Sequence, residues 1–189
     1  MLDGRGFSLI ELMISLLLSL LLVLAAAQLH MSLLRHDMRW LQRVQLLQTA
    51  ESIIAMLEQD LRGAGFRAGA STLAGDVFYA SATCLLTGRD MDRDGVIAGP
   101  QEWRGYRYVA ARGQLLVQGW HSVSNPARLC AQDLGWQPLL AEEWQVQEVS
   151  WQQERMDRPR RWRISLRLAI RGANVPSITL QRWVARRNA

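Results

Sequence analysis

The sequence predicts an α+β protein in which one long N-terminal helix precedes an antiparallel β-sheet. Two observations predict this class. Residues 12–34 carry no charged side chain, and apolar residues then recur every three or four positions as far as Ala64, as on one face of a helix. From about residue 106 the spacing changes to a period of two, which indicates strands with one buried face. A helix followed by strands indicates that the helix packs on one face of the sheet.

The uncharged run exceeds the roughly 20 residues that span a bilayer as a helix. An amphipathic stretch continues it in phase, with apolar positions at Leu34, Met38, Leu41, Val44, Leu47, Ala50, Ile54, Leu57, Leu61 and Ala64. No proline occurs before Pro100, so we expect one helix from about Phe7 to about Gly63, where a group of glycines would end it. Its first half would lie in a membrane and its second half would cover the sheet.

The later segments are predicted strands. Residues 106–109 and 115–117 would form a hairpin around residues 111–113, and residues 144–151 and 178–184 would add two strands. Alternation is most regular in a further predicted strand at residues 161–171. One face of this strand carries four arginines: Arg161, Arg163, Arg167 and Arg171. The chain has a net charge of +5, and all 22 of its basic residues are arginine. Such a face permits binding to nucleic acid or another anionic surface, but a solvated arginine-rich surface is the simpler interpretation.

An acidic loop precedes the hairpin. From Asp90 it reads Asp-Met-Asp-Arg-Asp-Gly, which matches the start of an EF-hand-type calcium loop. The twelfth position is Gln101 in place of Glu, and an acidic residue follows one position later. A Ca²⁺ site here would use Asp90, Asp92, Asp94 and Glu102. The alternative interpretation is a solvated turn between strands.

Two cysteines, Cys84 and Cys130, follow the apolar run. In an exported domain they would form a disulfide, and in the cytosol they would be two free thiols. The histidines form no ligand or base constellation, and no nucleophile, phosphate-loop or dinucleotide motif occurs. The sequence therefore predicts a protein that is not an enzyme.

One carboxylate, Glu11, begins the apolar run. An ionisable side chain at bilayer depth costs on the order of 2–3 kcal/mol, so a function is its default explanation. The surrounding segment, Gly6-Phe7-Ser8-Leu9-Ile10-Glu11, resembles the leader junction of type IV pilins and pseudopilins. The resemblance implies that a prepilin peptidase cuts between Gly6 and Phe7 and that the new amine of Phe7 is N-methylated. Glu11 would then face the terminal amine of a neighbouring subunit.

The whole chain resembles minor pilins of the PilW group, above all prepilin peptidase-dependent protein B, and is similar to the minor pseudopilin J of type II secretion. Besides the N-terminal motif, three features carry this resemblance: Asp-Leu-Arg-Gly-Ala-Gly-Phe at residues 60–66, the acidic loop before Tyr106-Arg107-Tyr108, and the cysteines placed around that loop. It implies a type IV pilin-like fold with a leader (1–6), a transmembrane half-helix (7–34) and a periplasmic domain (35–189).

The resemblance also implies partners and a place in the cell. The partners would be other minor pilins, the major pilin and the prepilin peptidase, and the protein would sit in the bacterial inner membrane before it enters a fibre. Three roles remain open: a minor pilin near the tip of a pilus, a pseudopilin of type II secretion, and a module on the pilus that binds DNA or an anionic surface.

Two observations oppose this interpretation. Ala25-Ala26-Ala27 fits the cleavage site of an ordinary secretory signal, although the preceding region lacks net positive charge and Glu11 interrupts it. Positive residues follow the apolar run at 35, 39 and 43, whereas Arg5 is offset by an aspartate, so charge alone does not favour export of the C-terminal domain.

Overall fold

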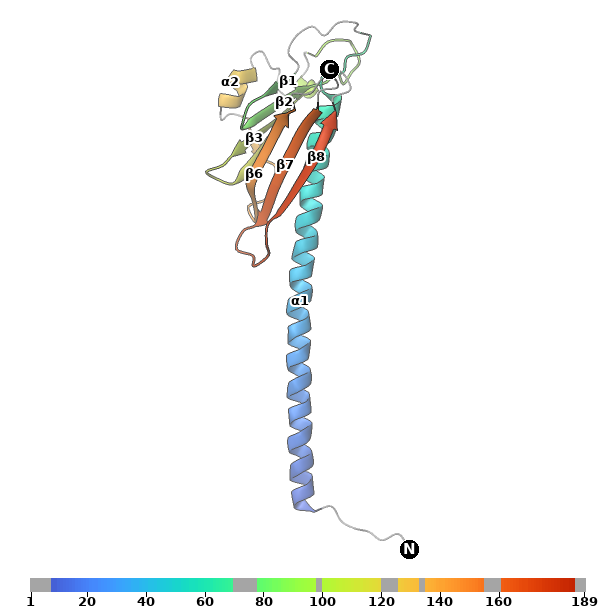
Figure 1. The fold of residues 1–189 in the computed structure, drawn as a ribbon, viewed down its shortest axis with the longest axis vertical. Helices are drawn as coiled ribbons and strands as arrows, with labels where there is room; N and C mark the ends of the chain where they lie inside the picture. The colour runs from blue at the N-terminus through green and yellow to red at the C-terminus, as the bar shows by residue number, and fades with distance from the viewer. Residues whose placement is uncertain are drawn as a thin grey trace. The chain divides into compact units, whose positions relative to one another are not determined.

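A single helix, α1 (Leu9–Gly63), begins the described chain of the computed structural model (Figure 1). The structure describes residues 8–69, 78–97, 100–119, 126–132, 135–154 and 161–185. The chain divides into two compact units, Met1–Arg43 and Val44–Ala189. The predicted helix is confirmed from Leu9 onward, and the predicted start at Phe7 lies outside the described residues.

The first unit contains the apolar part of α1. By length and composition this helix can cross a membrane. Its large apolar side chains are exposed. The hydroxyl groups of Ser15 and Ser19 are satisfied within the helix, because each donates a hydrogen bond of 2.9 Å to the carbonyl three residues earlier. A lipid environment requires this internal pairing, because no water is present there to bind exposed polar groups.

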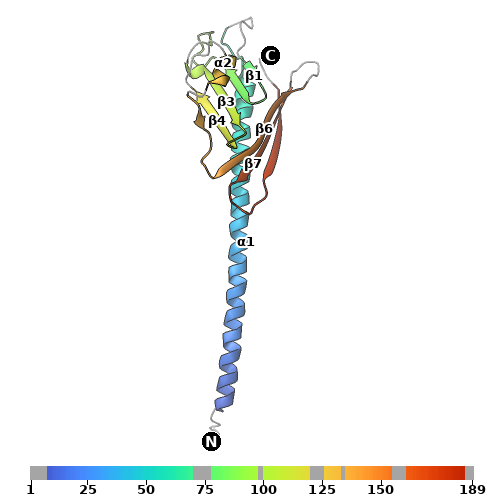
Figure 2. The same cartoon turned by 90° about the vertical axis from the view of Figure 1, so that its left-hand side faces the viewer.

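The second unit holds two antiparallel sheets, where the sequence predicted one. The first sheet pairs its strands in chain order: β1 (Phe78–Ala80), β2 (Cys84–Gly88), β3 (Trp103–Val109), β4 (Gln114–Gly119) and β5 (Gln137–Pro138). The second comprises β6 (Trp144–Gln153), β7 (Arg161–Ile170) and β8 (Ile178–Ala185). Figure 1 shows β6, β7 and β8 side by side, and Figure 2 shows β3 and β4 of the other sheet.

Two short helices lie between strands, η1 (Pro100–Glu102) and α2 (Pro126–Ala131). The predicted β3–β4 hairpin is present, and Gly113 closes its turn at a φ of 61°, which glycine adopts without a steric penalty. The predicted strands at 144–151, 161–171 and 178–184 correspond to β6, β7 and β8.

The C-terminal part of α1 forms one core with both sheets. Its buried residues are Leu46, Ala50, Ile53, Ile54, Leu57 and Leu61. Strand β7 contributes Ile164, Leu166 and Leu168, each fully buried, and Tyr106 and Leu115 come from the other sheet. The expectation that the amphipathic half of the helix covers a sheet is therefore confirmed and extended to two sheets.

The predicted apolar face differs from the buried stripe of α1 at every position before Ala50. Leu34, Met38 and Leu41 are exposed and Val44 is half-buried, so the buried stripe begins at Leu46. Leu47, which the periodicity assigned to the apolar face, is 46% exposed, whereas Leu46 is fully buried. Both positions continue a spacing of three or four residues from Ala50. Leu46 is the buried one of the two, because it packs in the same core cluster as the other buried residues of the helix and those of the sheets.

This pair gives a matched test of the core. Leu46→Ala is expected to lower the free energy of unfolding by about 2–4 kcal/mol, since it leaves a cavity in packed surroundings. Leu47→Ala removes the same atoms from an exposed site and should change it by less than about 0.5 kcal/mol. Denaturant unfolding of the full chain in a mild detergent measures both, and equal losses would contradict the assigned face.

Candidate functional site

The N-terminal motif places Glu11 in the first turn of α1, exposed and two residues after its start. Gly6 and Phe7, the predicted cleavage junction, lie outside the described residues. The backbone N–H groups of Glu11 and Leu12 donate to the carbonyl of Ser8, at 3.0 and 3.1 Å. Within the described part of the chain, the Glu11 carboxylate has no hydrogen bond or ion pair. Any partner for this charge therefore lies outside those residues.

Tyr106, Arg107 and Tyr108 of β3 each bind a different part of the fold. The Tyr106 hydroxyl is fully buried and donates a 2.5 Å hydrogen bond to Asp60 near the end of α1. Burial raises the pKa of Tyr106 well above its usual range, and the Asp60 carboxylate raises it further. This bond joins the residue 60–66 motif to the Tyr-Arg-Tyr motif. The sequence resemblance named both motifs but gave no physical link between them.

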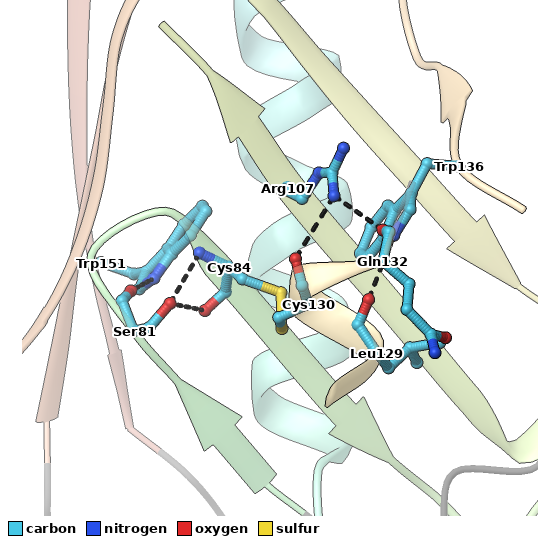
Figure 3. Close-up of a disulfide and its surroundings, with 8 residues drawn as sticks. All are labelled: Ser81, Cys84, Arg107, Leu129, Cys130, Gln132, Trp136 and Trp151. Atoms are coloured by element: carbon cyan, nitrogen blue, oxygen red, sulfur yellow. Dashed lines mark hydrogen bonds between the residues drawn. A yellow bond between two sulfur atoms is a disulfide. The ribbon is translucent and has the colours of Figure 1, made fainter. Parts of the chain in front are cut away.

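Arg107 points to the opposite face of β3, as alternation along a strand requires. Its guanidinium donates to the carbonyls of Cys130 and Gln132, at 3.3 and 2.7 Å, and lies 5.4 Å from the centre of the Trp136 ring (Figure 3). These carbonyls lie at the C-terminal end of α2, where a cation also interacts favourably with the helix dipole. Arg107 therefore holds α2 against the sheet.

The disulfide between Cys84 and Cys130 gives α2 a second attachment. Its Cα atoms are 5.9 Å apart, and it joins the buried strand β2 to a helix of only six residues. A helix this short is not stable alone in water. The predicted disulfide is present, and it closes the loop that contains the acidic segment and the hairpin.

Tyr108 links the two sheets. Its hydroxyl donates to the Gln147 carbonyl at 2.7 Å and is 3.3 Å from the Val146 carbonyl, both on β6. The register of β6 against β7 is irregular between Val146 and Glu148. Gln147 therefore occupies an interruption in the ladder, and its carbonyl is available to the tyrosine.

The acidic loop brings together all four of the predicted carboxylates. One carboxylate oxygen from each of Asp90, Asp92, Asp94 and Glu102 lies within 4.8 Å of those from the other three. The 3-10 helix η1 turns Glu102 toward the loop, while Gln101 is exposed. Glu102, the acidic residue one position after the twelfth, therefore joins the aspartates, as the sequence predicted.

The same carboxylates accept backbone hydrogen bonds. Asp90, only 2% exposed, accepts from the N–H groups of Ala68, Arg93 and Gly95 at 2.8, 2.6 and 3.0 Å. The bond from Ala68 contributes most to lowering the pKa of Asp90 below its usual value, against the opposing effect of burial. Glu102 accepts from the Met91 N–H at 3.1 Å. The group could hold a hard cation such as Ca²⁺, and it also closes its own loop.

The arginine face is built mainly on β7. Arg161, Arg163 and Arg167 are exposed and alternate with buried residues, and Arg171 lies in the turn after the strand. Arg163 lies 5.3 Å from the centre of the Trp183 ring on β8. Sequence reasoning noted no aromatic residue among these arginines. The neighbouring strand supplies one, because the register pairs Arg163 with Trp183.

Two family models match this chain, one at the N-terminal motif and one over the rest of the chain. Residues 1–27 match the prokaryotic N-terminal methylation motif, which with the long apolar helix defines a type IV pilin-like protein. Residues 39–186 match the model of prepilin peptidase-dependent protein B, and the chain belongs to that family. No curated protein and no solved structure matches the chain. Membership implies interaction with other pilins and with prepilin peptidase, anchoring in a membrane and incorporation in a fibre.

The buried tyrosine provides one test of this site. Tyr106→Phe keeps the ring and removes the hydroxyl, so it is expected to lower the free energy of unfolding by about 1–2 kcal/mol, because Asp60 loses its hydrogen bond. Tyr108→Phe, whose carbonyl partners are nearer water, should lower it less. Thermal unfolding of both variants measures the difference, and a larger loss at Tyr108 would contradict the role of Tyr106.

Titration with Ca²⁺ separates the two interpretations of the acidic loop. A cation site predicts heat of binding and a rise in melting temperature, both lost in Asp92→Asn, which changes an exposed ligand and leaves Asp90 in place. A loop closed only by its own hydrogen bonds predicts neither. Calorimetry on the full chain in detergent measures both quantities, and a response that Asp92→Asn retains would exclude the predicted ligand set.

Proposed function

We propose that this protein is a minor pilin of the PilW type, cut by prepilin peptidase and placed at or near the tip of a type IV pilus, where it primes assembly. The observation that carries this proposal is Glu11, a carboxylate without a partner in the described chain, beside 23 uncharged residues that begin at Leu12. The methylation motif and the family match support the same role. The role needs no catalytic group, and we propose that the protein is not an enzyme.

Cleavage after Gly6 would create the charge that Glu11 needs. The new α-amine on Phe7 is an ammonium group at neutral pH, and N-methylation keeps its charge. In apolar surroundings an unpaired carboxylate carries a large desolvation cost, which an ammonium partner of good geometry offsets. One such pair between neighbouring subunits would fix their register along the helix bundle.

We place the globular domain in the periplasm. The Cys84–Cys130 disulfide supports this side, because disulfides persist in oxidising compartments and are rare in the cytosol. The positive residues that follow the apolar run favour the opposite orientation by the positive-inside rule. The pilin leader supports export through a dedicated signal and therefore outweighs this count.

A minor pseudopilin of a type II secretion system is the second candidate. The N-terminal methylation motif favours it equally, because pilins and pseudopilins carry the same kind of leader. Deletion of the gene separates the two roles: loss of surface fibres supports a pilus, and loss of an exported enzyme from the medium supports secretion.

Glu11 is the residue to test. Glu11→Ala is expected to leave processing and membrane insertion intact and to lower the amount of protein in sheared fibres several-fold, because the charge pair between subunits is lost. Immunoblots of fibre and membrane fractions measure this, and N-terminal sequencing should begin at Phe7 in both proteins.

Ile10→Ala, in the same turn and equally exposed to its surroundings, is the matched control and should assemble normally. Glu11→Gln keeps the shape and removes the charge, so it should behave like Glu11→Ala. Normal fibre incorporation of both Glu11 variants would refute the role given to this carboxylate.

A further inference from the structure

The outer face of the β6–β7–β8 sheet presents arginines at regular intervals. Arg161 and Arg163 are two residues apart on β7, about 7 Å at strand spacing, and Arg167 lies about 13 Å further along. All three are exposed, while the alternate residues of the strand are buried in the core. The face therefore carries three exposed arginines in a line along one strand.

Neighbouring side chains hold two of these arginines in place. Arg163 donates to the Gln152 side chain on β6 at 3.0 Å, and Arg167 donates to the Thr179 hydroxyl on β8 at 3.1 Å. These partners are neutral. The strand register also puts Glu148 of β6 opposite Arg167, but no salt bridge to Arg161, Arg163 or Arg167 occurs among the residues that the structure describes, so each guanidinium keeps part of its donor capacity.

Trp183 adds an aromatic surface to the same face. Its side chain is 49% exposed although the guanidinium of Arg163 lies 5.3 Å from its ring centre. The pairing register puts Ala185, Gln181 and Thr179 on this side of β8. In the described part of the sheet, Trp183 is thus the one large apolar side chain on the face, and polar groups surround it.

We propose that this face binds single-stranded nucleic acid, with the arginines on successive phosphates and the Arg163–Trp183 pair stacked against a base. The site needs only the folded second unit and does not rest on fibre assembly. Single-strand binders combine a basic track with an exposed aromatic residue, which is the combination present here. The arginines lie on a strand face and not on a helix that could enter a duplex groove. An amphipathic membrane surface would present several apolar side chains, which this face lacks.

The test measures binding of the full chain, in zwitterionic detergent, to a fluorescein-labelled polythymidine strand. Three phosphate contacts predict that log K falls against log salt concentration with a slope of about −2. Replacing Arg161, Arg163 and Arg167 together by Gln should weaken binding at least tenfold. Trp183→Leu should weaken binding of the single strand about fivefold or more and leave duplex binding nearly unchanged.

Arg112→Gln is the matched control for Arg163→Gln, because it removes one exposed arginine from the β3–β4 turn, which belongs to the other sheet. It should leave the affinity within twofold of wild type, while Arg163→Gln should weaken it at least threefold. Melting curves of all variants confirm that they fold, and Arg167→Gln serves if Arg163→Gln does not.

Several outcomes would overturn the proposal. These are no binding of the strand at low salt, equal loss in Arg112→Gln and Arg163→Gln, and an affinity that Trp183→Leu does not change. Competition with heparin is a further test. If heparin at equal charge concentration displaces the strand from wild type and from Trp183→Leu alike, the face binds polyanions in general and base stacking is excluded.

Discussion

The hydrogen bond between Tyr106 and Asp60 connects the helix to the part of the sheet from which the other attachments extend. Asp60 lies in the last turns of α1, and Tyr106 lies in the middle of β3, buried among residues of both sheets. From the same strand, Arg107 reaches α2 and Tyr108 reaches β6. A buried hydroxyl without a partner would cost more than this bond contributes, so the pairing also fixes where the end of the helix meets β3.

The same region explains why the two sequence motifs occur together. After Gly63 the chain turns sharply at Gly65, whose φ of 81° suits glycine and whose N–H donates to the Gly88 carbonyl at 2.8 Å. That turn delivers Ala68 to the carboxylate of Asp90. The helix end, strand β2 and the acidic loop are therefore joined by hydrogen bonds, and a change at any one alters the others.

Local periodicity predicted part of the fold but missed β1, β2, β5 and the two short helices, and it did not predict how the elements meet. The long helix, the β3–β4 hairpin and the strands β6 to β8 follow from spacing along the chain. The division into two sheets does not, because alternation shows which face is buried and not which strand is the neighbour. Leu46 and Leu47 fit the same helical spacing, so only the sheets decide between them. Trp183 joins the arginine face through strand register, which is non-local and which spacing along the chain does not show.

The serines in the apolar part of α1 affect the energy of moving such a helix from a bilayer into a bundle of helices. Ser15 and Ser19 bind carbonyls of their own helix, and the backbone N–H and C=O groups pair along it, so its hydrogen bonds require neither lipid nor a neighbouring protein. Transfer from a bilayer to a bundle of similar helices would leave this inventory unchanged. Between residues 9 and 34, only Glu11 carries a charge whose energy depends on which of the two surrounds it. Glu11 is therefore the charged side chain of this stretch at which the two surroundings differ.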